Sequence, residues 1–150
     1  MTRSDVAEKS ARPTECLSAV IDAAVTATGA TSGWILRLAS DDFVVEAVSG
    51  AQPSERFVEL HRPLDGTAGY AASSLQPTAI RTRWCDDSNN GAGGFDGIPP
   101  CILAVPFLQQ QEAVVVLELA APASVSFSFD DVELVGLLAR VAAACLAERQ

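Results

Sequence analysis

Two long apolar segments restrict the folds that this chain can adopt, CILAVPFL at residues 101–108 and EAVVVLEL at residues 112–119. Each has the length of a β-strand, and apolar residues occupy both of its alternating faces. The polar turn between them, QQQ, is short enough to join neighbouring antiparallel strands. Strands without a polar face must be covered on both sides. The pair therefore predicts a central hairpin inside a layered α+β domain.

Helical periodicity marks both ends of the chain. Apolar side chains between residues 14 and 28 recur with the i, i+3, i+4, i+7 spacing, and Gly29 follows as a stop signal. At the other end, Ser128 and Asp131 have the spacing of a capping box, which predicts an amphipathic helix from there. The apolar stripe of that helix, over residues 132–146, is wider than contact with one sheet face requires.

Shorter elements complete the predicted order between these helices. They are a hairpin, a third strand, a glycine turn with a short helix, and a brief strand, at residues 32–50, 56–62, 64–77 and 78–82. We expect the terminal helices to cover one face of the sheet. The short helix and the irregular segment 83–100 are expected to lie over the other face. Residues 1–13 are interpreted as a flexible leader and residues 14–150 as a single domain.

The charge balance excludes some classes of partner. The formal net charge is −9 and the pI about 4.4, so phosphate backbones are repelled and we expect no nucleic-acid binding. No apolar run is long enough to span a bilayer, and the first residues lack the apolar core of a secretion signal. We therefore expect a cytoplasmic protein without a membrane partner.

The four cysteines do not have the spacing of a metal-binding or disulfide framework. No pair is spaced like a zinc knuckle, and His61 is the one histidine. We expect Cys16 and Cys145 to be buried as small hydrophobic residues. DDSNNG at residues 86–91 matches the first half of a calcium loop, but Gly97 stands where the bidentate Glu is required. We therefore predict no metal site.

Three segments, in order, resemble the GAF domain family over about residues 14–148: RPLDGTAGYAASSLQPTAI, IPPCILAVPFLQQQEAVVVLELAAP and FSFDDVELVGLLARVAAACLAE. They are similar to the family's glycine turn with its short helix, its central hairpin and its capped C-terminal helix. The chain departs from the family at Leu64, which replaces the first glycine of the turn, and it lacks the signature of cyclic-nucleotide binders. Asp86 follows Cys85, where bilin-attaching members have a histidine.

The resemblance implies five or six antiparallel strands, with a small-molecule pocket under the variable segment 83–100. The candidate ligand-binding residues are then Thr67, Ala68, Tyr70, Trp84, Cys85, Phe95 and Cys101. The start of the short helix offers free N–H groups, although a plain turn would have the same glycines. The aromatic residues either line the pocket or pin the loop to the core. Reactivity of Cys85 would need nearby cations, and Asp86 and Asp87 oppose those that are close in sequence.

The function predicted from these features is that of a non-enzymatic sensor for an unknown small molecule, with no cofactor required. One histidine leaves no Ser–His–Asp set, and no catalytic residue is assigned. Members of the family pair through their terminal helices, which implies a homodimer through residues 14–28 and 130–147 and a separate signalling protein as recipient. Two alternatives stay open. One is a ligand-free dimerisation or interaction scaffold. The other is a thiol redox sensor or reductase that uses Cys85 and Cys101, although Gly69 and Tyr70 stand where reductases of free methionine sulfoxide in this family have a cysteine.

Overall fold

The computed structural model of the chain describes residues 3–40, 42–50, 66–81, 101–110 and 113–148. Its elements, in chain order, are α1 (Arg3–Thr28), β1 (Ser32–Leu38), β2 (Phe43–Gly50), α3 (Thr67–Ser74), β3 (Thr78–Arg81), β4 (Cys101–Gln109), β5 (Ala113–Ala121) and α4 (Phe129–Ala147). The predicted strand at residues 56–62 and the segment 83–100 lie outside the described residues. Within the described ranges, no helix is long and apolar enough to cross a membrane.

The described strands form one antiparallel sheet of five strands in the order β2-β1-β5-β4-β3. The predicted central hairpin is β4 and β5, and its register runs from Cys101 opposite Ala121 to Gln109 opposite Ala113. Strand β5 lies in the middle, hydrogen-bonded to β1 on one side and to β4 on the other. Because β5 has neighbours on both edges, its side chains are covered once each face of the sheet is covered.

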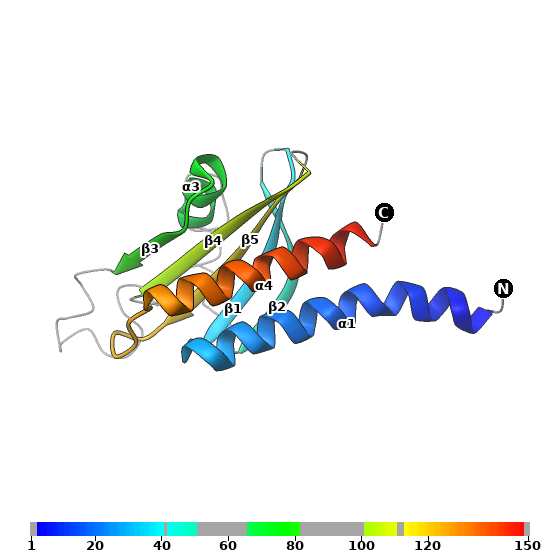
Figure 1. The fold of residues 1–150 in the computed structure, drawn as a ribbon, viewed down its shortest axis with the longest axis horizontal. Helices are drawn as coiled ribbons and strands as arrows, with labels where there is room; N and C mark the ends of the chain where they lie inside the picture. Colours follow the sequence, from blue (N-terminus) through cyan, green and yellow to red (C-terminus); the bar gives the residue numbers. More distant parts are fainter. Residues whose placement is uncertain (1–2, 41, 51–65, 82–100, 111–112, 149–150) are drawn as a thin grey trace.

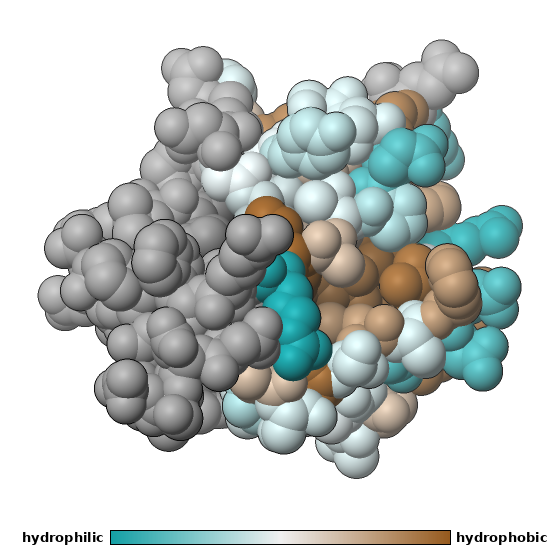
Figure 2. Space-filling model, turned by 90° about the vertical axis from the view of Figure 1, so that its left-hand side faces the viewer, coloured by the Kyte–Doolittle hydropathy of each residue, from teal (hydrophilic) through white to brown (hydrophobic). Residues whose placement is uncertain are grey.

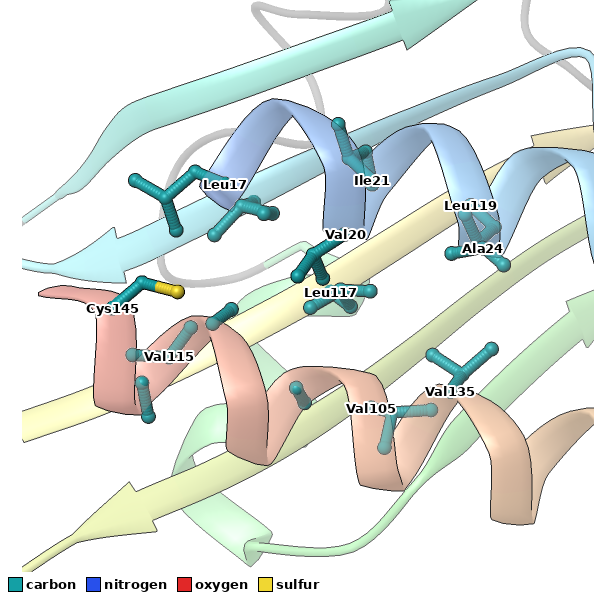
Figure 3. Close-up of a cluster of buried hydrophobic side chains, with 14 of the residues drawn as sticks. Leu17, Val20, Ile21, Ala24, Val105, Val115, Leu117, Leu119, Val135 and Cys145 are labelled. Carbon is teal, nitrogen blue, oxygen red and sulfur yellow. The ribbon is translucent and has the colours of Figure 1, made fainter. Parts of the chain in front are cut away.

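Helices α1 and α4 lie side by side on one face of the sheet and run in opposite directions (Figure 1). Alternate residues of β4 and β5 point toward them, because Leu103 and Val105 belong to the same buried cluster as Leu117 and Leu119. Figure 3 shows this cluster between the two helices and the strands. From the helices it receives Leu17, Val20, Ile21, Ala24, Val135, Ala139, Ala142, Ala143, Cys145 and Leu146.

Gly33 on β1 allows helix α1 to approach the sheet closely. A Cβ placed there would lie 2.7 Å from Cδ2 of Leu119 and 2.9 Å from Cδ1 of Ile21. Both distances are shorter than carbon atoms tolerate, so a larger residue would force the side chains of Leu119 and Ile21 to shift. The absence of a side chain at Gly33 is therefore part of how this face fits together.

Helix α3 covers the opposite face, and its contribution to the core consists of small side chains. Ala68, Ala71 and Ala72 pack with alternate residues of the strands, including Ile102 and Val116. The helix ends at Leu75, which adopts a left-handed conformation with φ 56° before Pro77. The predicted arrangement, with terminal helices on one face and the short helix on the other, is thus confirmed.

The boundaries of the terminal helices agree with the sequence in one case and differ in the other. At α4 the capping box forms as predicted: Ser128 Oγ accepts from the Asp131 N–H at 3.1 Å, and the Asp131 carboxylate accepts from the Ser128 N–H at 2.9 Å. Helix α1 begins at Arg3 and not at Thr14. Residues before Thr14 have no apolar periodicity, yet Ala, Glu, Lys and Arg among them are good helix formers.

The expectation for Cys16 and Cys145 is corrected by the structure. The two residues form a disulfide that joins α1 to α4, with their Cα atoms 6.4 Å apart and a sequence separation of 129. The prediction that Cys145 is buried holds, but the two cysteines are not independent hydrophobic residues. Sequence spacing contains no signal for this pair, because the packing of α1 against α4 is what brings them together.

Candidate functional site

Glu118 is the residue that distinguishes the α3 face from the rest of the core. It lies in the middle of β5, where the register places it opposite Trp34 of β1 and Ala104 of β4. Val116 and Ala120, two positions to either side, belong to the cluster under α3. Side chains alternate along a strand, so Glu118 lies on the α3 face as well.

The carboxyl group of Glu118 is buried, and one of its oxygens lacks a partner in the described part of the chain. The residue is 3% exposed, and Oε1 accepts no hydrogen bond from any described residue. Burial raises the pKa of the Glu118 carboxyl from 4.5 to about 8, because removal from water disfavours the charged form. A buried carboxyl oxygen without a partner costs folding free energy, so its presence in the central strand needs an explanation.

The described surroundings of Glu118 are mostly apolar, with many alanines and two aromatic side chains, and they carry little charge. In the described part of this face, Trp34, Leu36 and Phe43 pack with the alanines of α3 and with Ala104 and Ala120. The charged side chains described on the other four strands of the sheet are Arg37, Glu46 and Arg81. Arg37 pairs with Glu46 at 2.9 Å, and Arg81 donates to the Ala123 carbonyl at 2.8 Å.

Two of the predicted ligand-binding residues lie at the start of α3. Thr67 and Ala68 are buried, 4% and 0% exposed, and Ala68 belongs to the cluster under this helix. The N-cap residue, Gly66, makes no side-chain capping hydrogen bond. Tyr70, by contrast, is 63% exposed on α3, so its ring does not line the buried face. The structure therefore brings Thr67 and Ala68 to the same face as Glu118 and directs Tyr70 to the surface.

Cys101 lies on the other side of the sheet from α3. It opens β4 two positions before Leu103, which belongs to the cluster under α1 and α4, and its Sγ–H donates to the Val125 carbonyl at 3.4 Å. The thiol is buried and is not part of a disulfide. The remaining predicted residues, Trp84, Cys85 and Phe95, lie outside the described residues. Among the residues that are described, no group of three or more His, Cys, Asp and Glu side chains could hold a metal ion.

The outer side of α4 is a second candidate surface. The stripe from Leu17 to Ala24 on α1 is used inside the chain, as is Leu146 on α4. Exposed apolar side chains on α4 are Phe129, Leu134, Leu137 and Val141, of which Phe129 is 91% and Leu137 is 62% exposed. Figure 2 views the end of the molecule where α4 begins, and apolar side chains reach the surface there among polar ones.

Glu118 was missed by the sequence analysis, although a signal for it was present. In AVVVLELAA it is the single charged residue of an otherwise apolar strand, and Val116 and Ala120 share its alternating face. A strand that must be covered on both faces has no solvent-exposed position for such a residue. A lone charge in a doubly covered strand therefore predicts a buried ionisable group.

Comparison with known proteins gives one family and several solved structures. The family model described as GAF domain matches residues 10–147. No curated protein matches the sequence. The GAF-B domain of DevS from Mycobacterium smegmatis is 23% identical, with 91% of this chain and 95% of that chain covered and a TM-score of 0.64. The type II free methionine-R-sulfoxide reductase from Thermoplasma acidophilum is 13% identical, with 93% and 95% covered and a TM-score of 0.71.

A third solved structure shares the fold over almost the whole chain. The GAF domain of a phosphoenolpyruvate-protein phosphotransferase from Coxiella burnetii is 18% identical, with 98% of this chain and 91% of that chain covered and a TM-score of 0.66. At these identities the structural likeness establishes a common fold and no common ligand. The three solved structures thus place one architecture in proteins with different tasks.

Proposed function

Because this chain belongs to the GAF domain family, whose members are sensor and ligand-binding modules of signalling proteins, we propose that it binds a small molecule on the α3 face of its sheet. The observation that carries this proposal is Glu118, a carboxyl buried in the central strand with Oε1 unpartnered. A ligand that hydrogen-bonds Oε1 would replace the interaction with water that folding removes. Thr67 and Ala68 at the start of α3 would border the same site.

The test of ligand binding is native mass spectrometry of the freshly purified protein, together with its absorption spectrum. We expect a mass excess that persists under gentle ionisation and is lost on denaturation. The matched variant is Glu118→Gln, which keeps the shape of the side chain and removes its ability to ionise. A protein that is free of small molecules and whose melting temperature is unchanged by a metabolite library would leave the scaffold alternative in place of the sensor.

The second half of the proposal is a homodimer that transmits occupancy. The dimer was predicted to use residues 14–28 and 130–147. Because the apolar stripe of α1 is buried within one chain, we propose a smaller contact surface, on α4 alone. Leu134, Leu137 and Val141 lie on one side of α4 and are exposed, which is the spacing of a helix–helix contact. A ligand that binds one arrangement of the α4 pair more tightly would shift the equilibrium between arrangements.

Light scattering across a dilution series tests this dimer. We expect Leu137→Glu to convert the protein into a monomer, because a charge in the centre of the apolar stripe cannot be desolvated without a partner. Ser73→Glu is the matched control. Ser73 is exposed on α3, so this substitution adds the same charge on the other side of the sheet. A wild-type protein that is monomeric at every concentration would contradict the dimer and leave ligand binding untouched.

We propose no catalytic role. A reductase or thiol sensor built on Cys85 and Cys101 gains no support from Cys101, whose buried thiol lies on the α1 and α4 side and donates to a backbone carbonyl. The absence of enzymatic activity stays a prediction. The cytoplasmic location also stays a prediction, and the Cys16–Cys145 disulfide counts against it, because such bonds are rare in reducing compartments. The recipient signalling protein is proposed to be a separate chain.

A further inference from the structure

The position of Glu118 limits the chemistry of what can bind there. It lies on the central strand between Trp34 and Ala104, and the described residues that cluster on this face are apolar, with Ser32 and Thr67 as buried hydroxyl groups beside them. Five buried alanines belong to that cluster, and each occupies less space than a leucine or a valine of the opposite face. They are Ala68, Ala71, Ala72, Ala104 and Ala120. Small side chains around a buried acid leave the least steric hindrance to a ligand group that approaches the carboxyl.

Charge neutralisation for Glu118 does not come from the described part of the chain. Arg37 and Arg81, the two arginines described in the sheet, both lie in register with residues of the opposite face. Arg37 aligns with Val115 and Arg81 with Cys101, and these partners alternate with the residues under α3. Helix α3 contributes Tyr70 as its one ionisable side chain, and that ring is exposed. The described residues that face Glu118 from β1, β4 and α3 therefore include no cation.

Resting on the proposed function, we propose that the small molecule bound on the α3 face carries a cationic nitrogen, an ammonium, amidinium or guanidinium group, which hydrogen-bonds the Glu118 carboxylate. Charge-assisted hydrogen bonds of this kind are the strongest that a carboxylate makes. Trp34, the cross-strand neighbour of Glu118, adds a second attraction, because an indole ring draws cations to its face. An acid and an indole side by side in an apolar wall select a cation over a neutral molecule of the same shape.

Binding of a cation at Glu118 is linked to release of a proton. Without a ligand, burial raises the pKa of the Glu118 carboxyl to about 8, so the group is largely protonated at pH 7. A cationic ligand requires the carboxylate and must displace that proton. Its affinity therefore rises with pH, by close to tenfold per unit between about pH 6 and pH 7, and levels off above the pKa of the empty site. A ligand that accepts a hydrogen bond from the protonated acid has the opposite dependence.

The experiment uses matched pairs of small probes that differ in charge and not in shape. The pairs are benzamidine with benzamide, phenylguanidine with phenylurea, and benzylamine with benzyl alcohol. Dissociation constants are measured by ligand-observed NMR at pH 6 and pH 8, for the wild type and for Glu118→Gln. We expect cationic members to bind the wild type at least tenfold more tightly than their neutral partners at pH 8. The preference should shrink at pH 6 and vanish in Glu118→Gln.

The variant also controls for the acidic surface of the chain, whose net charge of −9 attracts any cation. Glu118→Gln keeps every surface carboxylate, so a cation preference that persists in it is non-specific and overturns the inference. Neutral probes that bind more tightly than cationic ones would contradict the preference for a cation, but they would still support a binding site on the α3 face. If no probe binds either protein and no small molecule co-purifies, the proposed function fails, and the inference fails with it.

Discussion

In the described part of the chain, the two faces of the sheet differ in one respect, because a charged residue is buried on one of them and none on the other. Under α1 and α4 the core combines branched aliphatic residues such as Leu17, Ile21 and Leu117 with alanines of both helices, and no described charged residue belongs to it. Under α3 the helix contributes alanines, and the strand beneath contributes the carboxyl of Glu118. The first face has the composition of a core that is complete within one chain. The second contains a group that reduces the stability of the empty protein.

This contrast separates the residues that stabilise the fold from those that are candidates for function. Each buried aliphatic side chain under α1 and α4 contributes about 1.5–3 kcal/mol by leaving water, and none carries a polar group that needs a partner. An unpartnered carboxyl contributes an opposing term. Natural cores tolerate such a cost mainly at sites where the group does something. We therefore expect that removing an aliphatic side chain under α1 and α4 lowers the free energy of unfolding, and that removing the ionisable group of Glu118 raises it at pH 8.

The disulfide between Cys16 and Cys145 should give the largest effect, on the α1 and α4 face. The double variant Cys16→Ser, Cys145→Ser is expected to lose about 3–5 kcal/mol of unfolding free energy, because the bond closes most of the chain into a loop. Guanidinium denaturation without reductant measures the loss. As the internal control, reductant should bring the wild type down to the double variant and leave the double variant unchanged. Free thiols at both positions in the oxidised wild type would show that the bond is absent.

The next effect is the pH dependence caused by Glu118, on the α3 face. The folded-state pKa of its carboxyl, about 8, lies above the unfolded value near 4.5, so the folded protein holds the proton more tightly. Stability from this group is therefore complete below about pH 4.5 and is lost as pH rises toward 8. The wild type should lose about 3 kcal/mol between pH 5 and pH 8 relative to Glu118→Gln. Denaturation of both proteins at the two pH values measures the difference, and parallel curves would contradict it.

Much of the fold could be predicted because it follows from periodicity. Apolar residues on both faces of 101–108 and 112–119 predicted the doubly covered hairpin, and Ser128 with Asp131 predicted the start of α4. The Cys16–Cys145 bond could not be predicted, because it depends on which helices lie side by side. Of the site, the location of Thr67 and Ala68 at the start of a buried helix was predictable. Glu118 was overlooked because the strand AVVVLELAA is strongly apolar on average, and one charged residue changes that average little.

A pair of glycine substitutions sharpens the contrast between tight and open positions on the α1 and α4 face. Gly33→Ala should destabilise the protein by about 1–3 kcal/mol, because the added methyl group collides with Leu119 and Ile21. Gly136→Ala on α4 is the matched control, since the nearest atom to its added Cβ is Cγ1 of Val105 at 3.9 Å. That change should stabilise α4 by up to about 1 kcal/mol through helix propensity. Thermal unfolding of the two variants measures both, and equal shifts would show that α1 is free to move.

The smallest effect concerns the start of α4, where exposed capping hydrogen bonds, and not buried side chains, contribute to the free energy of unfolding. Ser128→Ala removes the side chain that accepts from the Asp131 N–H, and we expect a loss of about 1 kcal/mol. Ser128→Asp should retain the cap and most of the stability, because a carboxylate accepts the same hydrogen bond and interacts favourably with the helix dipole. Denaturation midpoints of the three proteins rank these cases.

If α4 also forms the dimer contact, Ser128→Ala should weaken dimerisation as well, since fraying of the first turn reaches toward Leu134. A variant that loses stability at unchanged dimer affinity would place the contact further along the helix, around Leu137 and Val141.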